Sequence, residues 1–181
     1  MEIIVASRRS SKAAIVDHAN RVVIDLTSKA AQPWVRFSPF YPHGAIPVPG
    51  WPDLTAQSVE GIWQGLKVFE HEGTDLSRLE LSTMRGIKRS GAKRGRVLGH
   101  QAGPSGELLS YVTARRAIYL PAYRWVLEHC LQAEVAALRE LAQEKSIRLL
   151  DYETNCSVDD TTAPLSHAFL VACFVRGEWP G

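Results

Sequence analysis

Proline is crowded into one segment of this chain, and that segment limits the possible fold more than any other feature. Six prolines stand between residues 33 and 52, among five large aromatic residues: Pro33, Pro39, Pro42, Pro47, Pro49 and Pro52, with Trp34, Phe37, Phe40, Tyr41 and Trp51. Proline fixes φ and lacks an N–H group, so a regular helix cannot form at this density. Because a disordered linker has no use for so many aromatic rings, we predict an ordered, packed loop that lines a site.

Periodic patterns on either side of this segment predict both strands and helices. Short runs rich in β-branched residues at 3–7, 13–17 and 22–25 predict two or three antiparallel strands. Further along, residues 147–152 resemble a buried strand, and helices are predicted over 107–118, from Pro121 through Lys145, and from Pro164 onward. The predicted class is α+β: a single compact, helix-rich domain over residues 1–181 with a small N-terminal antiparallel β element.

Composition excludes several classes of protein. The chain is 45% hydrophobic and 22% charged with a net charge of +2, which is ordinary for a globular protein and gives no global field toward nucleic acid or membrane. No apolar run approaches the roughly 18 residues that a membrane helix needs, and the N-terminal run is too short for a signal peptide, so we expect a cytoplasmic protein without a membrane partner. The three cysteines have no metal-ligand or disulfide spacing, and no metal or cofactor is predicted.

A helical pattern begins at Thr55. Apolar residues recur at helical spacing, and either Asp53 or Thr55 could cap the start while Gly73 could end the helix: the stripe is Val59, Ile62, Trp63, Leu66 and Phe69. A second stripe carries Glu60, Gln64 and Lys67, which fall within about 60° of one another at roughly 100° per residue. A carboxylate, an amide and an ammonium in line suit acid–base chemistry. A solvated face with a Glu/Lys pair would show the same spacing.

Two segments together resemble a known family. The sequence Phe-Ser-Pro-Phe-Tyr-Pro at 37–42 is followed by Ser-Val-Glu-Gly-Ile-Trp-Gln-Gly-Leu-Lys at 58–67. These are similar to the NADAR family's F-S-N-F-Y-P loop and V-E-H-x-x-Q-x-x-K helix. The matching positions are Phe37, Ser38, Phe40, Tyr41, Pro42, Val59, Glu60, Gln64 and Lys67. The resemblance covers about residues 34–69, with Pro39 in place of the family's asparagine and Gly61 in place of its histidine.

The resemblance implies a compact domain that hydrolyses N-glycosides. Family activities include the removal of ADP-ribose from guanine in DNA and the breakdown of ribosylated pyrimidine intermediates. The glutamate and lysine of the family's helix are its catalytic candidates, which correspond to Glu60 and Lys67. Residues of the two motifs and their neighbours would bind the substrate: Phe37, Ser38, Phe40, Tyr41, Trp63 and Gln64.

A basic, glycine-rich segment at 84–106 is a second candidate for substrate binding. It contains no acidic residue, and we select Arg94 and Arg96 as phosphate ligands, because arginine beside accessible backbone N–H groups suits phosphate capture. A flexible solvated loop is the alternative. Near the C-terminus, Asp160 could bind a ribose hydroxyl, or belong to a helix start. His167 could act on the substrate, or be a hydrogen-bonded histidine at the edge of the core.

The expected substrate is a phosphorylated ribosyl or ADP-ribosyl compound, free or within nucleic acid. Glu60 would stabilise an oxocarbenium-like sugar and deprotonate water. Lys67 would protonate the leaving base, or attack the opened sugar as a Schiff-base nucleophile. A base-modifying glycosyl transferase and a non-catalytic ADP-ribose or nucleotide-binding module are the alternative functions.

Overall fold

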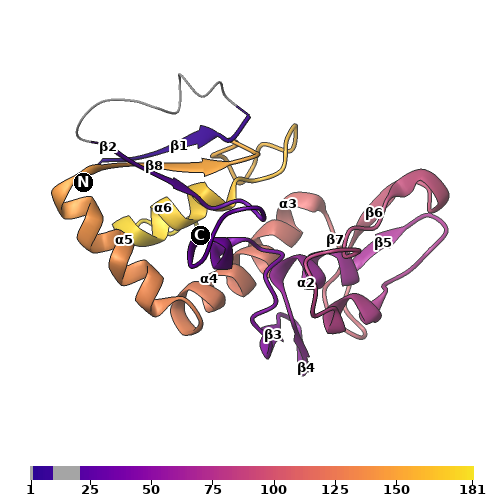
Figure 1. Ribbon diagram of the computed structural model, residues 1–181. Helices are drawn as coiled ribbons and strands as arrows, with labels where there is room; N and C mark the ends of the chain where they lie inside the picture. Colours follow the sequence, from indigo (N-terminus) through magenta and orange to yellow (C-terminus); the bar gives the residue numbers. More distant parts are fainter. Residues whose placement is uncertain (1, 10–20) are drawn as a thin grey trace. The chain divides into compact units, whose positions relative to one another are not determined.

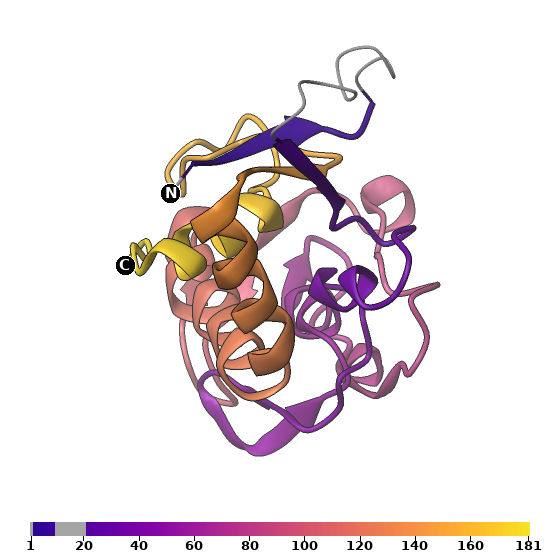
Figure 2. The same ribbon diagram turned by 60° about the vertical axis from the view of Figure 1, so that its left-hand side comes forward.

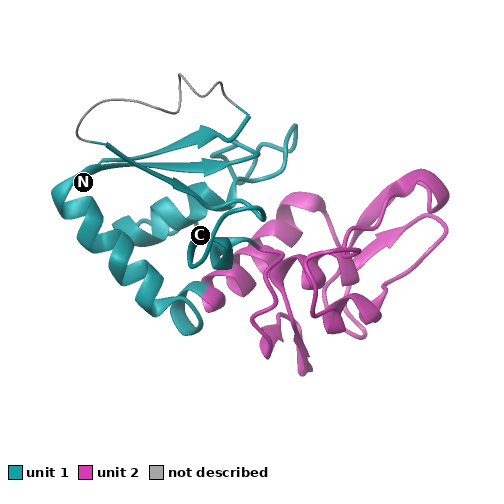
Figure 3. Cartoon of the chain, viewed as in Figure 1, with its two compact units in different colours: residues 1–38, 127–181 teal, residues 39–126 magenta. Residues whose placement is uncertain are grey.

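The computed structural model describes residues 2–9 and 21–181 and divides the chain into two compact units (Figure 3). Unit 1 combines both ends of the chain, residues 1–38 and 127–181, and unit 2 is the continuous segment 39–126. Helices and strands occur in both units, so the predicted mixed α+β class is confirmed.

Unit 1 contains a parallel sheet of three strands. Strand β8 (Ser146–Asp151) lies between β1 (Ile3–Ser7) and β2 (Arg21–Asp25), and runs parallel to both (Figure 1). The predicted positions of these strands agree with the structure, but the predicted antiparallel pairing is wrong. The reason is that β8, from the far end of the chain, takes the place between the two N-terminal strands. The predicted strand at 13–17 lies outside the described residues.

Helices α5 (Gln132–Glu144) and α6 (His167–Arg176) cover one face of this sheet (Figures 1 and 2). Helix α6 begins three residues after Pro164, because the Ser166 hydroxyl caps it by accepting the N–H of Phe169 at 3.2 Å. It ends at Gly177, whose φ of 78° is the left-handed conformation of a helix C-cap. The apolar core of unit 1 includes Ile24, Leu26, Leu138, Ile147, Leu149, Leu170 and Val171.

The helices predicted over 107–118 and from Pro121 to Lys145 are divided differently in the structure. Residues 108–109 form a strand, one continuous helix runs from Tyr111 past Pro121 to His129, and a second begins at Gln132. Helix α3 (Tyr111–Ala114) continues through a π-helical turn, η4 (Arg115–Tyr119), into α4 (Leu120–His129), which runs from unit 2 into unit 1. Pro121 lies inside this helix, as the second residue of α4, two residues after the end of the π turn. A proline removes one helical N–H and crowds the preceding turn, and a π turn is one way to accommodate it. Cys130 and Leu131 then separate α4 from α5.

Unit 2 is built from short elements. Strands β3 (Ile46–Val48) and β4 (Trp51–Ala56) form a hairpin within the proline-rich segment, which also contains the 3-10 turn η1 (Trp34–Phe37) of unit 1. Helix α2 (Val59–Gly65) follows, and then an antiparallel sheet in the order β5 (Lys67–Phe69), β6 (Val97–Gln101), β7 (Leu108–Leu109). Two 3-10 turns, η2 (Leu76–Glu80) and η3 (Gly91–Lys93), complete the unit.

The predicted helix at Thr55 is therefore shorter at both ends. Thr55 and Asp53 belong to β4, and the helix is capped by Ser58, whose hydroxyl accepts the N–H of Gly61 at 3.0 Å. At the other end the chain turns into strand β5 rather than continuing to Gly73. The apolar stripe is nevertheless buried along its whole length. Among the described residues, none of the helices has the length and apolar character to cross a membrane.

Candidate functional site

Helix α2 is held against the backbone of η2 by its two glycines. A Cβ at Gly61 would lie 2.7 Å from the carbonyl oxygen of Arg78, and one at Gly65 would lie 3.3 Å from that of Asp75. The N–H of Asp75 donates to the Gly65 carbonyl at 2.8 Å. Glycine at position 61 is therefore a packing requirement in this chain, because a side chain there would meet the backbone of η2.

Glu60 is a buried carboxylate on α2, only 8% exposed. Its backbone N–H donates to the carbonyl oxygen of Pro39 at 2.8 Å, so the proline-rich loop and the helix motif meet at this residue. Burial raises the pKa of Glu60 above its ordinary value, while a hydrogen bond from Gln64 and the charges of Lys88 and Lys67 oppose that rise.

Gln64 connects Glu60 to Lys67. Its amide nitrogen donates to Glu60 Oε1 at 2.8 Å, and its amide oxygen accepts from Lys67 Nζ at 3.2 Å and from the backbone N–H of Arg89 at 3.1 Å. Two donors on the amide oxygen fix which end of the amide faces Glu60. The prediction that all three side chains share one helix face is wrong for Lys67, which is the first residue of β5. The three groups are linked all the same.

Lys67 is partly buried, and burial is the main reason that its pKa is lowered. The charges of Arg89 and Lys88 lower this pKa further, and Glu60 opposes them. The pKa of the Glu60 acid and that of the Lys67 ammonium are thus displaced toward each other. Shifts of this kind, produced by burial and neighbouring charges, are common among the acid and base groups of functional sites.

Arg89 holds the end of α2 and the start of β5 together, a role that the sequence did not indicate. Its Nη1 donates to the carbonyl oxygens of Gln64 at 3.0 Å and Lys67 at 2.7 Å. Its Nη2 donates to Glu72 Oε1 and to the Gly73 carbonyl, both at 2.7 Å. The residue is 5% exposed. In the sequence it is one cation among several in a basic segment, and nothing in the pattern singles it out.

The basic segment is paired with acids that precede it in the chain. Arg94 Nε lies 2.6 Å from Glu72 Oε2, and Arg96 Nε lies 2.6 Å from Glu70 Oε1. The segment includes η3 and β6, so part of it has regular structure. Phosphate binding by Arg94 and Arg96 stays a prediction, and a phosphate would have to compete with these glutamates.

Lys88 is a second residue that the sequence analysis missed. It is exposed, its Nζ lies 5.4 Å from the centre of the Phe40 ring, and its charge lowers the pKa of Glu60. In the part of the chain that the structure describes, no carboxylate lies within ion-pair distance of Lys88. Lys88 is therefore an exposed cation without an ion-pair partner in the described residues, beside an aromatic ring of the motif loop.

Trp63 lies in an aromatic cluster. Its ring centre is 3.8 Å from that of His100, and Tyr111 and Tyr119 meet it edge-on at 5.5 Å and 5.7 Å. Trp63 is 7% exposed, so most of its surface is committed to these packing contacts. Its predicted role in substrate binding stays a prediction.

The loop residues predicted to bind substrate fall in both units. Phe37 and Ser38 belong to unit 1, where both are buried, and the Phe37 ring stacks on Trp34 with centres 6.2 Å apart. Phe40 and Tyr41 belong to unit 2, where the Tyr41 ring lies 4.9 Å from that of His43. Whether these side chains share a substrate with Glu60 stays a prediction.

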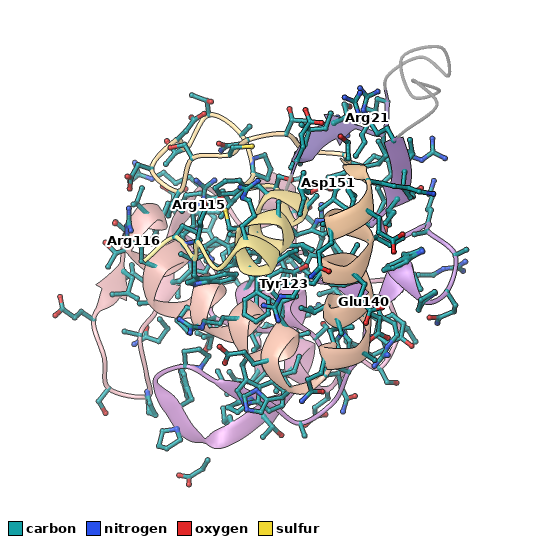
Figure 4. All side chains as sticks on the ribbon, turned by 90° about the vertical axis from the view of Figure 1, so that its left-hand side faces the viewer. Arg21, Arg115, Arg116, Tyr123, Glu140 and Asp151 are labelled. Atoms are coloured by element: carbon teal, nitrogen blue, oxygen red, sulfur yellow. The ribbon has the colours of Figure 1, made fainter. Side chains whose placement is uncertain are left out.

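His167 and Asp160 are both engaged within unit 1. Both ring nitrogens of His167 have partners: Nδ1 lies 3.0 Å from Asp151 Oδ2, and Nε2 lies 2.9 Å from the Leu26 carbonyl oxygen. Asp151, labelled in Figure 4, also accepts the Ser166 hydroxyl at 2.8 Å, beside the start of α6. Asp160 Oδ1 accepts the N–H and the hydroxyl of Thr162, as in an aspartate-stabilised turn. These contacts favour structural roles.

His167 and Asp151 each favour the charged form of the other. Asp151 raises the pKa of His167 against the effect of burial, and His167 with Ser166 lowers the pKa of Asp151 to about 2. Because a buried serine that donates to the aspartate cannot be activated by the histidine, this is not a nucleophilic triad. Within residues 2–9 and 21–181, no group of three histidine, cysteine, aspartate or glutamate side chains is placed to hold a metal ion.

Comparison with models of protein families identifies a family for this chain. Residues 7–171 match the model described as "Family of unknown function (DUF6939)", and the chain belongs to this family. No curated protein and no solved structure matches it. The match spans residues of both units, including the whole of unit 2 and therefore Glu60, Gln64 and Lys67.

Proposed function

We propose that this protein is an N-glycosidase that hydrolyses the bond between ribose and a nucleobase, with Glu60 and Lys67 as its catalytic residues. The observation that carries the proposal is the chain of hydrogen bonds from Lys67 through Gln64 to Glu60. A surface Glu/Lys pair needs neither the burial of Glu60 nor a bridging amide. The resemblance of residues 37–42 and 58–67 to the NADAR motifs points to the same reaction.

In the proposed reaction the bond between the sugar carbon and the base nitrogen breaks, and its electron pair leaves with the base. Lys67 gives a proton to the base as it departs. The anionic Glu60 stabilises the oxocarbenium-like sugar and accepts a proton from the water whose oxygen attacks the same carbon. Gln64 holds the carboxylate in place through its amide N–H. Protons and charge balance, since one proton enters the base and one leaves the water.

The substrate we propose is a phosphorylated ribosyl or ADP-ribosyl base, free or within nucleic acid. Lys88 supports an anionic substrate, because it is an exposed cation beside Phe40 and acts electrostatically on Glu60. Arg94 and Arg96 would add to this attraction only by exchanging Glu72 and Glu70 for a phosphate.

The proposal is tested by incubating the protein with ADP-ribosylated DNA, nicotinamide dinucleotide and ribosylated pyrimidines, and identifying products by mass spectrometry. Release of a free base with uptake of one solvent oxygen from ¹⁸O water identifies hydrolysis. Transfer to another acceptor would leave the label out of the sugar, and would point to the glycosyl transferase instead. Lack of turnover with every substrate, together with binding of ADP-ribose, would leave the binding module.

Glu60→Gln tests the role of the carboxylate. The substitution keeps size and hydrogen-bonding capacity but removes the charge, so kcat should fall at least about a hundredfold while KM changes little. Glu80→Gln, the same change at an exposed position of unit 2, is the control and should be fully active. Near-normal turnover of Glu60→Gln would remove Glu60 from the mechanism. Lys67→Met should also lose activity, and a borohydride-trapped adduct on Lys67 would establish the Schiff-base route in place of acid catalysis.

A further inference from the structure

His100 in β6 is a buried polar residue without an assigned role. It is completely buried, and neither ring nitrogen makes a hydrogen bond in the described part of the chain. The backbone of Trp63 acts to raise the pKa of His100, but no hydrogen bond joins the two residues. Each unpaired buried polar group costs on the order of 1–3 kcal/mol, and such groups are uncommon in folded proteins. A phenylalanine would give the same stacking on Trp63 without this cost.

The position of His100 places it beside the proposed catalytic lysine. In the antiparallel register of β5 and β6, His100 is the direct partner of Lys67. Directly opposed residues of antiparallel strands project to the same face, with Cβ atoms about 4.5–5.5 Å apart. The two side chains also interact electrostatically, because burial and the charge of Lys67 lower the pKa of His100 to about 3. The imidazole is therefore neutral across the working pH range.

A neutral imidazole and a lysine ammonium are complementary. The imidazole offers one unprotonated nitrogen as an acceptor, and the ammonium has three N–H donors. One donor of Lys67 is directed to Gln64 Oε1 at 3.2 Å. His100 offers an acceptor on the opposing strand, directly across from Lys67 in the register.

We propose that His100 is a positioning residue for Lys67, and that its unprotonated ring nitrogen accepts a hydrogen bond from the Lys67 ammonium in solution. Two donors would then be held by Gln64 and His100, and the tetrahedral ammonium would present its third to the departing base. The catalytic consequence rests on the proposed N-glycosidase function, whereas the hydrogen bond itself does not.

The hydrogen bond is tested without any substrate. NMR titration of the Lys67 side chain, with the lysine carbons labelled, gives its pKa in the wild type, in His100→Phe and in His100→Gln. A hydrogen bond to the charged form raises a lysine pKa, so His100→Phe should lower it and His100→Gln, which keeps an acceptor, should restore part of it. The ¹⁵N signal of the unprotonated His100 nitrogen should also shift in Lys67→Met. An identical Lys67 pKa in wild type and His100→Phe would overturn the proposal, whatever the enzyme's activity.

The same variants separate positioning from packing. His100→Phe keeps a ring against Trp63 and removes two unpaired polar atoms, so its melting temperature should equal or exceed that of the wild type. Its kcat should nevertheless fall about tenfold, the equivalent of one hydrogen bond. Because activity requires charged Lys67 in the proposed reaction, the alkaline limit of the pH profile should move to lower pH. A loss of stability with an unmoved pH limit would assign His100 to packing alone.

Discussion

Replacing Arg89 with methionine should destabilise unit 2 strongly, although Arg89 lies in a segment whose sequence resembles a solvated basic loop. The guanidinium donates four hydrogen bonds, to the carbonyl oxygens of Gln64, Lys67 and Gly73 and to the Glu72 carboxylate. Hydrogen bonds to a charged group contribute about 1.5–3 kcal/mol each but are not additive. The buried Nε has no partner, which reduces the net gain. A loss of about 3–5 kcal/mol is expected, as for a broken buried ion pair.

The measurement is the free energy of unfolding from urea titration, followed by circular dichroism and tryptophan fluorescence. Arg96→Met is the matched control, because the Arg96 side chain is 78% exposed in its pair with Glu70 and such pairs contribute about 0–1 kcal/mol. Arg89→Lys should resemble Arg89→Met more than wild type, since an ammonium cannot reproduce the planar fork. Equal, small losses in Arg89→Met and Arg96→Met would refute the structural role assigned to Arg89.

Three further predictions concern stability and binding. Because the pKa of His167 is raised in the folded protein, this residue stabilises unit 1 below about pH 6.5, and its contribution to stability is lost as pH rises through the folded-state pKa. Because the pKa of Asp151 is lowered, its contribution to stability is lost as pH falls from about 4 toward 2. The melting temperature should therefore be highest between about pH 4 and 6.5. His167→Gln should have a lower melting temperature in this range and should lose the decline above it; an unchanged alkaline decline in that variant would contradict the assignment. Gly61→Ala should destabilise by about 1–3 kcal/mol in urea titration because its Cβ meets the Arg78 carbonyl, whereas Gly73→Ala, where a Cβ meets no atom within 4 Å, should be near neutral. Neutralising Arg94 and Arg96 together should weaken ADP-ribose binding and flatten its salt dependence, as measured by calorimetry; unchanged affinity across a salt series, with a loss in Lys88→Met, would transfer the anion-binding role to Lys88.

Local sequence determined the elements whose signals lie within a few residues. Strands β1, β2 and β8 follow, to within one residue at either end, from short runs of β-branched and apolar side chains. The apolar stripe from Val59 to Phe69 is buried as its spacing requires. The cluster of Glu60 and Gln64 also follows from local spacing, since residues four apart on a helix are neighbours. The mixed α+β class needed no more than these patterns.

Tertiary structure decided where hydrogen-bond partners come from. Residues 67–69 include Phe69, the last apolar residue of the helical stripe. They nevertheless form a strand, because β6, about thirty residues later, pairs with them through backbone hydrogen bonds. The order β1-β8-β2 requires a strand from the other end of the chain, and no local pattern specifies that pairing. Arg89 and His100 acquire their environments in the same way: a side chain's sequence neighbours do not fix which distant carbonyl, ring or ammonium it will meet. Burial, and with it the pKa of Glu60 and of Lys67, therefore belongs to the folded protein and not to the motif.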